Sequence, residues 1–186
     1  KCEKHTTIRN QPTNTNKGFH QLLKALPLVV KQFPDTKVYL SGVKSLKSDT
    51  LKHKLIETGY IRYLRDEIKK ANLDKNIFFL GPLDAEQMKQ QYLNANIFVS
   101  PSTIENSPNS IGEAQILGTP VISSYVGGVS DMIENNVSGF LYRFEETNTL
   151  AFLICKLFAG DVNYEEITHN EIQVAKQRHD PIINTT

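Results

Sequence analysis

Short apolar segments alternate with longer amphipathic ones along most of this 186-residue chain, and this alternation constrains the fold more than any other feature. The short segments are rich in β-branched and aromatic residues and are bounded by turn residues, which is typical of buried strands. They are TKVYLSG (36–42), NIFFLG (76–81), NIFVSPS (96–102), TPVISS (119–124) and GFLYR (139–143), with HTTI (5–8) as a weaker example. Strands that alternate with helices form a parallel sheet covered on both faces. We therefore expect an α/β fold, a Rossmann-like parallel sheet of about six strands with helices on both faces.

The longer segments predict the helices between these strands. Apolar residues recur at helical spacing in residues 18–34 and 49–72, although Pro27 should kink or break the first helix and Gly59 should interrupt the second. Further helices are expected over residues 84–95 (with Asp84 as N-cap), 108–118, 130–136, 146–159 and 162–178. No strand follows the last two helices, and we expect this pair to pack as an appendage.

The composition argues against several classes of protein. The chain carries 21 basic and 20 acidic residues, and this net charge of +1 does not fit a protein that binds nucleic acid through a broad basic surface. Its two cysteines, Cys2 and Cys155, match neither a disulfide framework nor a zinc spacing. The apolar runs are too short to span a bilayer. We expect a cytoplasmic location, with the full-length protein able to lie peripherally on the inner membrane face. The chain begins KCEKH, and we take it as a piece of a longer protein.

Ligands of open parallel sheets bind beyond the carboxyl ends of the strands, so the residues that follow each strand are the first candidates for a site. Here they are Gly42, Gly81-Pro82, Ser100-Pro101-Ser102 and Ser123-Ser124. No Gly-x-Gly-x-x-Gly follows a strand, no phosphate-loop motif occurs, and no strand ends in paired acids. The sequence therefore disfavours a dinucleotide-binding protein, a phosphate-loop NTPase and a phosphoryl-accepting signalling domain.

The stretch IENSPNSIGEA (104–114) places Glu105 in the loop after a strand and Glu113 about one turn inside the next helix. Pro108 suits a first helical turn, because its missing N–H would have no partner there. The backbone N–H groups of residues 109–111 should then be free at the positive end of the helix dipole, which attracts an anion. An anion flanked by two hydroxyl-binding carboxylates describes a sugar, a diphosphate and a ribose. The spacing alone also fits two solvated acids.

Other segments extend this pattern over nearly the whole chain. They are Lys17-Gly18, VYLSG (38–42), IFFLGPL (77–83), NIFVSPSTIENSPNSIGEAQILGTPVISS (96–124), GG (127–128), SGFLY (138–142) and RHD (178–180). In order and approximate spacing they resemble the C-terminal, donor-binding domain of GT-B glycosyltransferases of the retaining family called glycosyl transferases group 1. The segment 96–124 is the most specific, because ENSPNSIGEA matches the Glu-x7-Glu motif of that family. The resemblance implies that residues 1–186 form a nucleotide-sugar binding domain, the C-terminal half of a GT-B fold, and that the N-terminal acceptor domain is absent from this chain.

The resemblance also implies roles for particular residues. Glu105 would contact hydroxyl groups of the transferred sugar and Lys17 would neutralise the diphosphate, and these two are the catalytic candidates. Glu113 would hold the ribose diol, the backbone of residues 107–111 would face the sugar and diphosphate, and Pro82-Leu83 would line the base pocket. The complete set of implied donor-binding residues is Gln11, Lys17, Gly42, Pro82, Leu83, Asn106, Ser107, Pro108, Asn109, Ser110, Ile111 and Glu113.

One departure from the family pattern concerns a second cation. Many members carry an arginine a few residues before the Lys-Gly pair, and the two residues grip the diphosphate together. Here Arg9 lies eight residues before Lys17. Either Arg9 contacts the diphosphate, or it is a strand residue that faces elsewhere and Gln11 lies nearer the phosphate. Gly127-Gly128 likewise fits either a tight turn or a backbone contact to the sugar.

No Asp-x-Asp occurs in the sequence, so no obvious pair of carboxylates would hold a divalent ion. We expect no metal and no cofactor, because the helix N-terminus and Lys17 would stabilise the departing nucleoside diphosphate.

The resemblance implies a metal-independent, hexosyltransferase-like enzyme that retains the configuration of the donor, with the isolated domain inactive. Its partners would be a nucleotide sugar and a glycan or lipid-linked acceptor, the latter bound through the missing domain, in bacterial surface-glycan biosynthesis. Two alternatives remain open: a GT-B nucleotide-sugar epimerase and a non-catalytic nucleotide-sugar-binding module.

Overall fold

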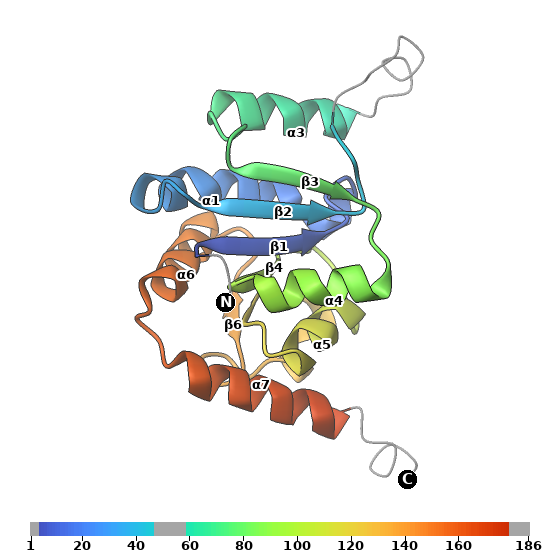
Figure 1. Ribbon diagram of the computed structural model, residues 1–186, viewed down its shortest axis with the longest axis vertical. Coiled ribbons are helices and arrows are strands. Elements are labelled where there is room, and N and C mark those ends of the chain that lie inside the picture. Colours follow the sequence, from blue (N-terminus) through green and yellow to red (C-terminus); the bar gives the residue numbers. More distant parts are fainter. Residues whose placement is uncertain (1–3, 47–58, 179–186) are drawn as a thin grey trace.

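A six-stranded parallel sheet forms the centre of the protein (Figure 1). The computed structural model describes residues 4–46 and 59–178. The strands are β1 (Thr6–Asn10), β2 (Lys37–Ser41), β3 (Ile77–Gly81), β4 (Ile97–Ser100), β5 (Val121–Ser124) and β6 (Phe140–Tyr142). They lie in the order β3-β2-β1-β4-β5-β6, and each neighbouring pair is parallel. The predicted Rossmann-like fold class, including the weak first strand, is confirmed.

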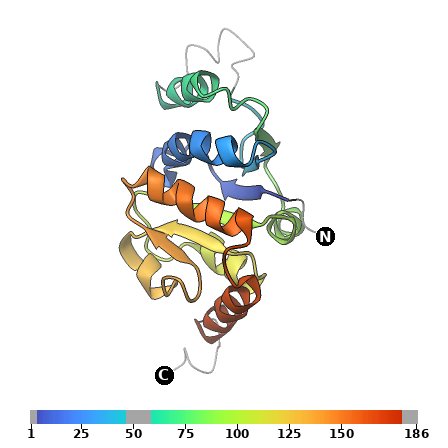
Figure 2. The same cartoon turned by 90° about the vertical axis from the view of Figure 1, so that its left-hand side faces the viewer.

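Helices cover both faces of the sheet, as Figures 1 and 2 show from two directions. One face is covered by α1 (Phe19–Gln32), α3 (Gly59–Lys70) and α6 (Thr147–Ala159). The other face is covered by α4 (Ala85–Asn94) and α5 (Asn109–Ile116), and α7 (Tyr164–Arg178) packs on α5. Two short 3₁₀ helices, η1 (Thr15–Lys17) and η2 (Gly127–Asp131), lie in the loops.

The two faces bury separate apolar clusters because successive side chains of a strand point to opposite sides. In β4, Val99 joins the cluster under α1 and α6, whereas Phe98 joins the cluster under α4 and α5. Ile8 of β1 lies with Phe98, which places its neighbours Thr7 and Arg9 on the α1 side. This alternation decides which side chains of β1 lie on the α1 side of the sheet and which lie on the α4 side.

Three expectations about the helices are wrong. Pro27 does not end α1, which continues from Phe19 to Gln32 with Leu22, Leu26 and Val29 buried along one stripe. The helix expected over residues 130–136 does not form: the 3₁₀ helix η2 spans Gly127–Asp131 and reaches only the first two of those residues. The last two helices are no appendage, because α6 packs against α1 and α7 against α5. Residues 49–58 of another expected helix lie outside the described residues.

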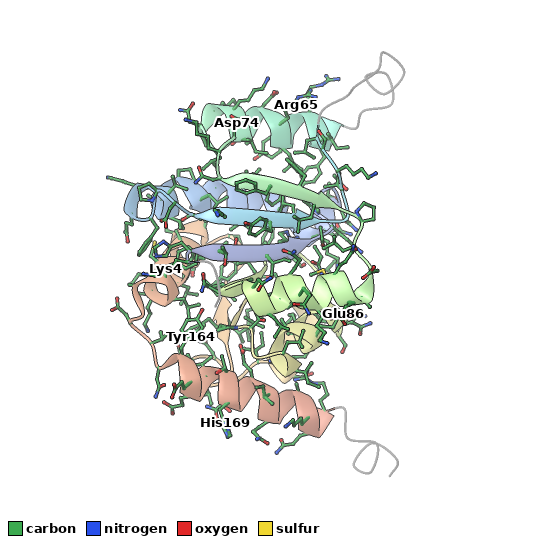
Figure 3. The ribbon with its side chains drawn as sticks, viewed as in Figure 1. Lys4, Arg65, Asp74, Glu86, Tyr164 and His169 are labelled. Carbon is green, nitrogen blue, oxygen red and sulfur yellow. The ribbon has the colours of Figure 1, made fainter. Side chains whose placement is uncertain are left out.

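The start of α7 is anchored to the sheet. The hydroxyl of Tyr164, labelled in Figure 3, donates a hydrogen bond to the carbonyl of Asn96 just before β4. In contrast, Glu86 on α4 lies on the surface and pairs with Lys89 of its own helix (3.4 Å). Among the helices of residues 4–46 and 59–178, none has the length and apolar character needed to cross a membrane.

Candidate functional site: a corner between two neighbouring strands

The strands β1 and β4 are neighbours, but the chain leaves them toward opposite faces of the sheet. After β1 it passes through η1 into α1, and after β4 it passes through a loop into α5. Ligands of open α/β sheets bind at the carboxyl ends of strands whose loops diverge in this way, and we call this region of the structure the crevice. Both catalytic candidates, Lys17 and Glu105, lie in these two loops.

The Lys17-Gly18 corner is held tightly against the loop after β4. Gly18 adopts a left-handed conformation (φ 66°) and serves as the N-cap of α1. A Cβ on this residue would lie 1.7 Å from the carbonyl oxygen of Pro101, so only glycine fits here. The backbone of Asn16 adds a further link by accepting a hydrogen bond from the N–H of Thr103 (2.8 Å). The position of Lys17 is therefore fixed relative to the exit of β4.

Lys17 and Glu105 pair across the crevice. The ammonium of Lys17 lies 2.5 Å from Oε1 of Glu105. The lysine side chain is 29% exposed and the glutamate side chain 11%, so the pair is partly shielded from solvent and from salt. The lysine can still be reached from the crevice, whereas the carboxylate is largely covered.

Gly127 and Gly128 hold the loop that carries Glu105. The N–H of Gly128 donates to the carbonyl of Glu105 (3.2 Å). A Cβ on Gly127 would lie 1.9 Å from that same carbonyl oxygen, and one on Gly128 would lie 2.0 Å from the carbonyl oxygen of Asn106. These two glycines therefore allow two backbones to pack directly together, a role that the sequence alone did not predict.

The N-terminus of α5 follows the loop that carries Glu105. The helix begins at Asn109, with Pro108 as an N-cap that makes no side-chain hydrogen bond. The expectation of three free N–H groups is wrong for Ile111, whose N–H donates to the carbonyl of Pro108 (3.0 Å). Within the part of the chain that the structure describes, the N–H groups of Asn109 and Ser110 have no partner. These two groups, at the positive end of the helix, remain available to an anion.

Glu113 lies inside α5 and opens onto a pocket of about 370 Å³. Its Oε2 accepts a hydrogen bond from the hydroxyl of Tyr92 (3.2 Å), which in turn accepts one from the amide of Asn10 at the end of β1 (3.2 Å). Burial raises the pKa of Tyr92, so the phenol stays neutral and continues to donate to the carboxylate. Leu83, one of the two residues expected beside the base, also lines this pocket.

Backbone hydrogen bonds connect the ends of β1, β2 and β3 to one another. Gln11 has a left-handed conformation (φ 51°), is exposed, and donates its N–H to the carbonyl of Ser41 (3.1 Å). Gly42 donates to Gly81 (2.8 Å), and Gly81 donates to Val43 (3.0 Å). Gly42 and Gly81 both have positive φ, which places the chain directly after each strand, including Pro82, in a sharp turn.

Arg9 does not reach this surface. It is a strand residue with 2% of its surface exposed, and its Nη1 donates to the carbonyl of Val99 in β4 (3.3 Å). Of the two alternatives from the sequence, the structure places Arg9 inside the protein and Gln11 at the surface after β1. The burial of a full arginine side chain is not visible in the sequence, because β1 is otherwise an ordinary short strand.

A clamp from α7 holds the other side of α5. The side chain of Gln115, which is fully buried, donates to the carbonyl of Met132 (2.9 Å). Arg178 donates to the side chain of Gln115 (3.2 Å) and to the carbonyl of Met132 (3.0 Å). The resemblance included Arg178 only as part of a short motif, without a role. The contact shows that the last described helix supports the helix that carries Glu113.

This fold, together with the family match over most of the chain, is that of the C-terminal domain of a GT-B protein. Residues 12–176 match the family described as glycosyl transferases group 1. The chain belongs to this family.

Curated relatives agree with this assignment. The chain is 24% identical over 154 residues to an uncharacterised glycosyltransferase of Methanocaldococcus jannaschii, covering 83% of this chain and 36% of the relative. It is 28% identical over 155 residues to the capsular polysaccharide biosynthesis glycosyltransferase CapM of Staphylococcus aureus, covering 83% of this chain and 37% of CapM. The chain thus spans little more than one third of the length of these relatives.

Solved structures show the same fold. HepE of Anabaena in complex with UDP-glucose superposes with a TM-score of 0.80 at 24% identity, covering 96% of this chain and 45% of HepE. The C-terminal domain of a glycosyl transferase group 1 family protein, LpcC of Francisella tularensis, superposes with a TM-score of 0.76 at 21% identity. That likeness covers 96% of this chain and 87% of the LpcC domain, which agrees with a single domain.

Proposed function

We propose that this chain is the donor-binding domain of a glycosyltransferase. It binds a nucleoside-diphosphate sugar in the crevice between the loops after β1 and β4. The complete protein transfers the sugar, with retention of configuration, to a glycan or lipid-linked acceptor. The observation that carries this proposal is the Lys17–Glu105 pair (2.5 Å), because it brings the two implied catalytic residues together from distant parts of the chain.

The crevice offers complementary groups to each part of such a donor. The ammonium of Lys17 and the N–H groups of Asn109 and Ser110 suit the diphosphate. The carboxylate of Glu105 suits hydroxyl groups of the sugar, and Glu113, beside its pocket, suits the ribose diol. Positive groups fixed before the reaction stabilise the negative charge that develops on the leaving diphosphate.

The relatives support a proposal for the acceptor site and for the pathway. The chain spans 36–45% of several relatives, so we assign the acceptor to a further, N-terminal domain of the whole protein. The similarity to CapM supports a role in the synthesis of a bacterial surface polysaccharide. Catalysis requires both substrates in register, a positioning effect worth about 7–11 kcal/mol of the barrier. We therefore expect the chain alone to bind donor but not to transfer sugar.

Titration calorimetry with a panel of nucleotide sugars tests the binding step. We expect the chain to bind one or more of them weakly, with a Kd nearer millimolar than nanomolar, about −4 to −6 kcal/mol. Lys17→Met should weaken this binding about tenfold or more, because it removes a charge-assisted contact to the diphosphate. Failure to bind any nucleotide sugar or nucleoside diphosphate would refute the proposal.

Transfer assays test the division into domains. The chain and a longer protein that includes the acceptor domain are given the bound donor and a panel of glycan and lipid-linked acceptors. We expect transfer only from the longer protein. Transfer by this chain alone at a comparable rate would show that it is more than a donor domain.

A further inference from the structure

Arg9 is a buried cation whose hydrogen-bonding groups are mostly unused. Its Nη1 donates to Val99, but its Nε and Nη2 have no partner among the described residues. Fully buried arginines are rare, and buried polar atoms are nearly always hydrogen-bonded. Two unpaired donors on one buried guanidinium therefore need an explanation.

Other unpaired polar atoms lie around the same corner of the site. Among the described residues, Oγ of Ser102 and Oε1 of Gln21 are also buried without a partner. Gln21 donates through its amide to the carbonyl of Phe144 (3.1 Å), and the Phe144 ring lies 3.2 Å from where a Cβ of Gly18 would be. Ser102 follows the proline that packs on Gly18. These groups are thus gathered beneath the corner that presents Lys17.

Arg9 remains charged in this environment. Burial lowers its pKa to about 10, and this effect is opposed by Tyr142, Tyr60 and Glu105. An arginine with that pKa is protonated at neutral pH. A buried charge that lacks a bonded carboxylate is costly to the stability of a fold. The presence of Arg9 here indicates a contribution other than stability.

The contribution of Arg9 concerns the position of the Glu105 carboxylate. This carboxylate is held by Lys17 at 2.5 Å. A diphosphate at the N-terminus of α5 competes with Glu105 for the ammonium of Lys17. Binding of the nucleotide sugar therefore weakens the ion pair between Lys17 and Glu105. The Arg9 side chain extends from β1 to β4, the strand that leads into the Glu105 loop. Its Nε and Nη2 have no hydrogen-bond partner among the described residues. It is too deeply buried to meet the diphosphate itself.

We propose that Arg9 is a positioning residue for Glu105. Its guanidinium hydrogen-bonds the Glu105 carboxylate when the bound nucleotide sugar has taken Lys17 as a partner for its diphosphate. Glu105 is then kept in place for the sugar while Lys17 serves the diphosphate. This inference rests on the proposed function. It concerns the sugar-bearing part of the donor only, which separates it from a role in binding diphosphate.

The test uses Arg9→Met, which keeps an unbranched apolar chain like the aliphatic part of arginine but removes the charged guanidinium. We expect an equal or higher midpoint of thermal unfolding, unchanged affinity for the nucleoside diphosphate, and about tenfold weaker binding of the nucleotide sugar, as expected for a lost charge-assisted contact. Arg9→Lys should recover part of that loss. Thr7→Val is the matched control, because Thr7 lies on the same face of β1 and has a buried, unpaired hydroxyl among the described residues. It should leave both affinities unchanged.

A lowered unfolding midpoint for Arg9→Met would overturn the inference in favour of a structural role, and this measurement needs no ligand. Equal losses of affinity for both ligands, or no loss for the nucleotide sugar, would also overturn it. If the unmodified chain binds neither ligand, the proposed function fails as well. If the unmodified chain and Arg9→Met bind the sugar donor alike, only this inference fails.

Discussion

Lys17 and Glu105 lie 2.5 Å apart although 88 positions separate them in the sequence. The pair connects the loop after β1 to the loop after β4, the two loops that diverge around the crevice. In the function that we propose, the cation that binds the diphosphate is therefore already paired with the acid that binds the sugar. Binding of the nucleotide sugar therefore has to replace the contact between Lys17 and Glu105. We expect mutation of Glu105 and mutation of Glu113 to affect ligand binding differently.

Glu113→Ala should weaken binding of both the free nucleoside diphosphate and the nucleotide sugar. The carboxylate opens onto the pocket beside α4, and loss of its charge-assisted hydrogen bonds to a ribose diol should cost about 1.5–3 kcal/mol, or roughly tenfold to a hundredfold in affinity. Glu105→Ala should spare the free nucleotide and weaken only the sugar donor. Calorimetry with both ligands checks this. Equal losses for both ligands in both variants would contradict the assignment.

Gly128→Ala should disrupt the loop that carries Glu105. A Cβ would lie 2.0 Å from the carbonyl oxygen of Asn106, so the two backbones must separate. We expect a loss of about 1–3 kcal/mol in the free energy of unfolding, as for other overpacked sites, together with weaker binding of the nucleotide sugar. Gly59→Ala is the control, because a Cβ there meets nothing within 4 Å. Urea unfolding of both variants decides the matter, and similar stabilities would show that the loop yields easily.

Glu171 should make the stability depend on pH. Its Oε1 accepts a hydrogen bond from the N–H of Val121 (2.8 Å), while its Oε2 is buried without a partner among the described residues. Burial raises the pKa of Glu171 well above the usual value. Its contribution to stability is therefore fully present below the pKa of the unfolded chain, about 4.3, and is lost as pH rises through the pKa of the folded state.

Glu171→Gln keeps an oxygen for Val121 but cannot ionise. We expect this variant to gain stability over the unmodified chain as pH is raised from about 5 to about 8. Thermal unfolding across this range measures the difference. Glu165→Gln, on the exposed side of the same helix, should run parallel to the unmodified chain. If the Glu171→Gln curve also runs parallel, the buried carboxyl does not titrate as described.

Nucleoside diphosphate binding should need no divalent ion. The sequence contains no Asp-x-Asp, and Lys17 and the start of α5 supply positive charge in the described part of the site. Calorimetry with a chelator and then with magnesium provides the test. An affinity that rises more than about tenfold with magnesium would mean that the metal carries the charge stabilisation that we assign to the protein.

Most of the sheet could be predicted because buried parallel strands read as short apolar runs, such as NIFVS before the site. The Glu-x7-Glu stretch also located the loop and helix that carry Glu105 and Glu113. Pro27 misled, because the cost of a proline in a helix, about 3 kcal/mol, is local, whereas the packing that offsets it comes from distant residues such as those of α6.

The remaining features depend on contacts between distant segments. Nothing in the sequence around Arg9 shows that the folded chain buries it. The packing of Gly128 on Asn106 likewise arises only when two loops meet. The sequence shows where such glycines and charged residues occur. Only the folded chain shows which residues they contact.

The clamp from α7 has a consequence for the time at which the site matures. Ribosomes build the chain from its N-terminus, so Gln115 and Met132 emerge long before Arg178, which binds them both. A nascent chain that already displays Lys17, Glu105 and Glu113 still lacks the side chain that fastens the back of α5. The contact that fastens the back of α5 can therefore form only after residue 178 has left the ribosome.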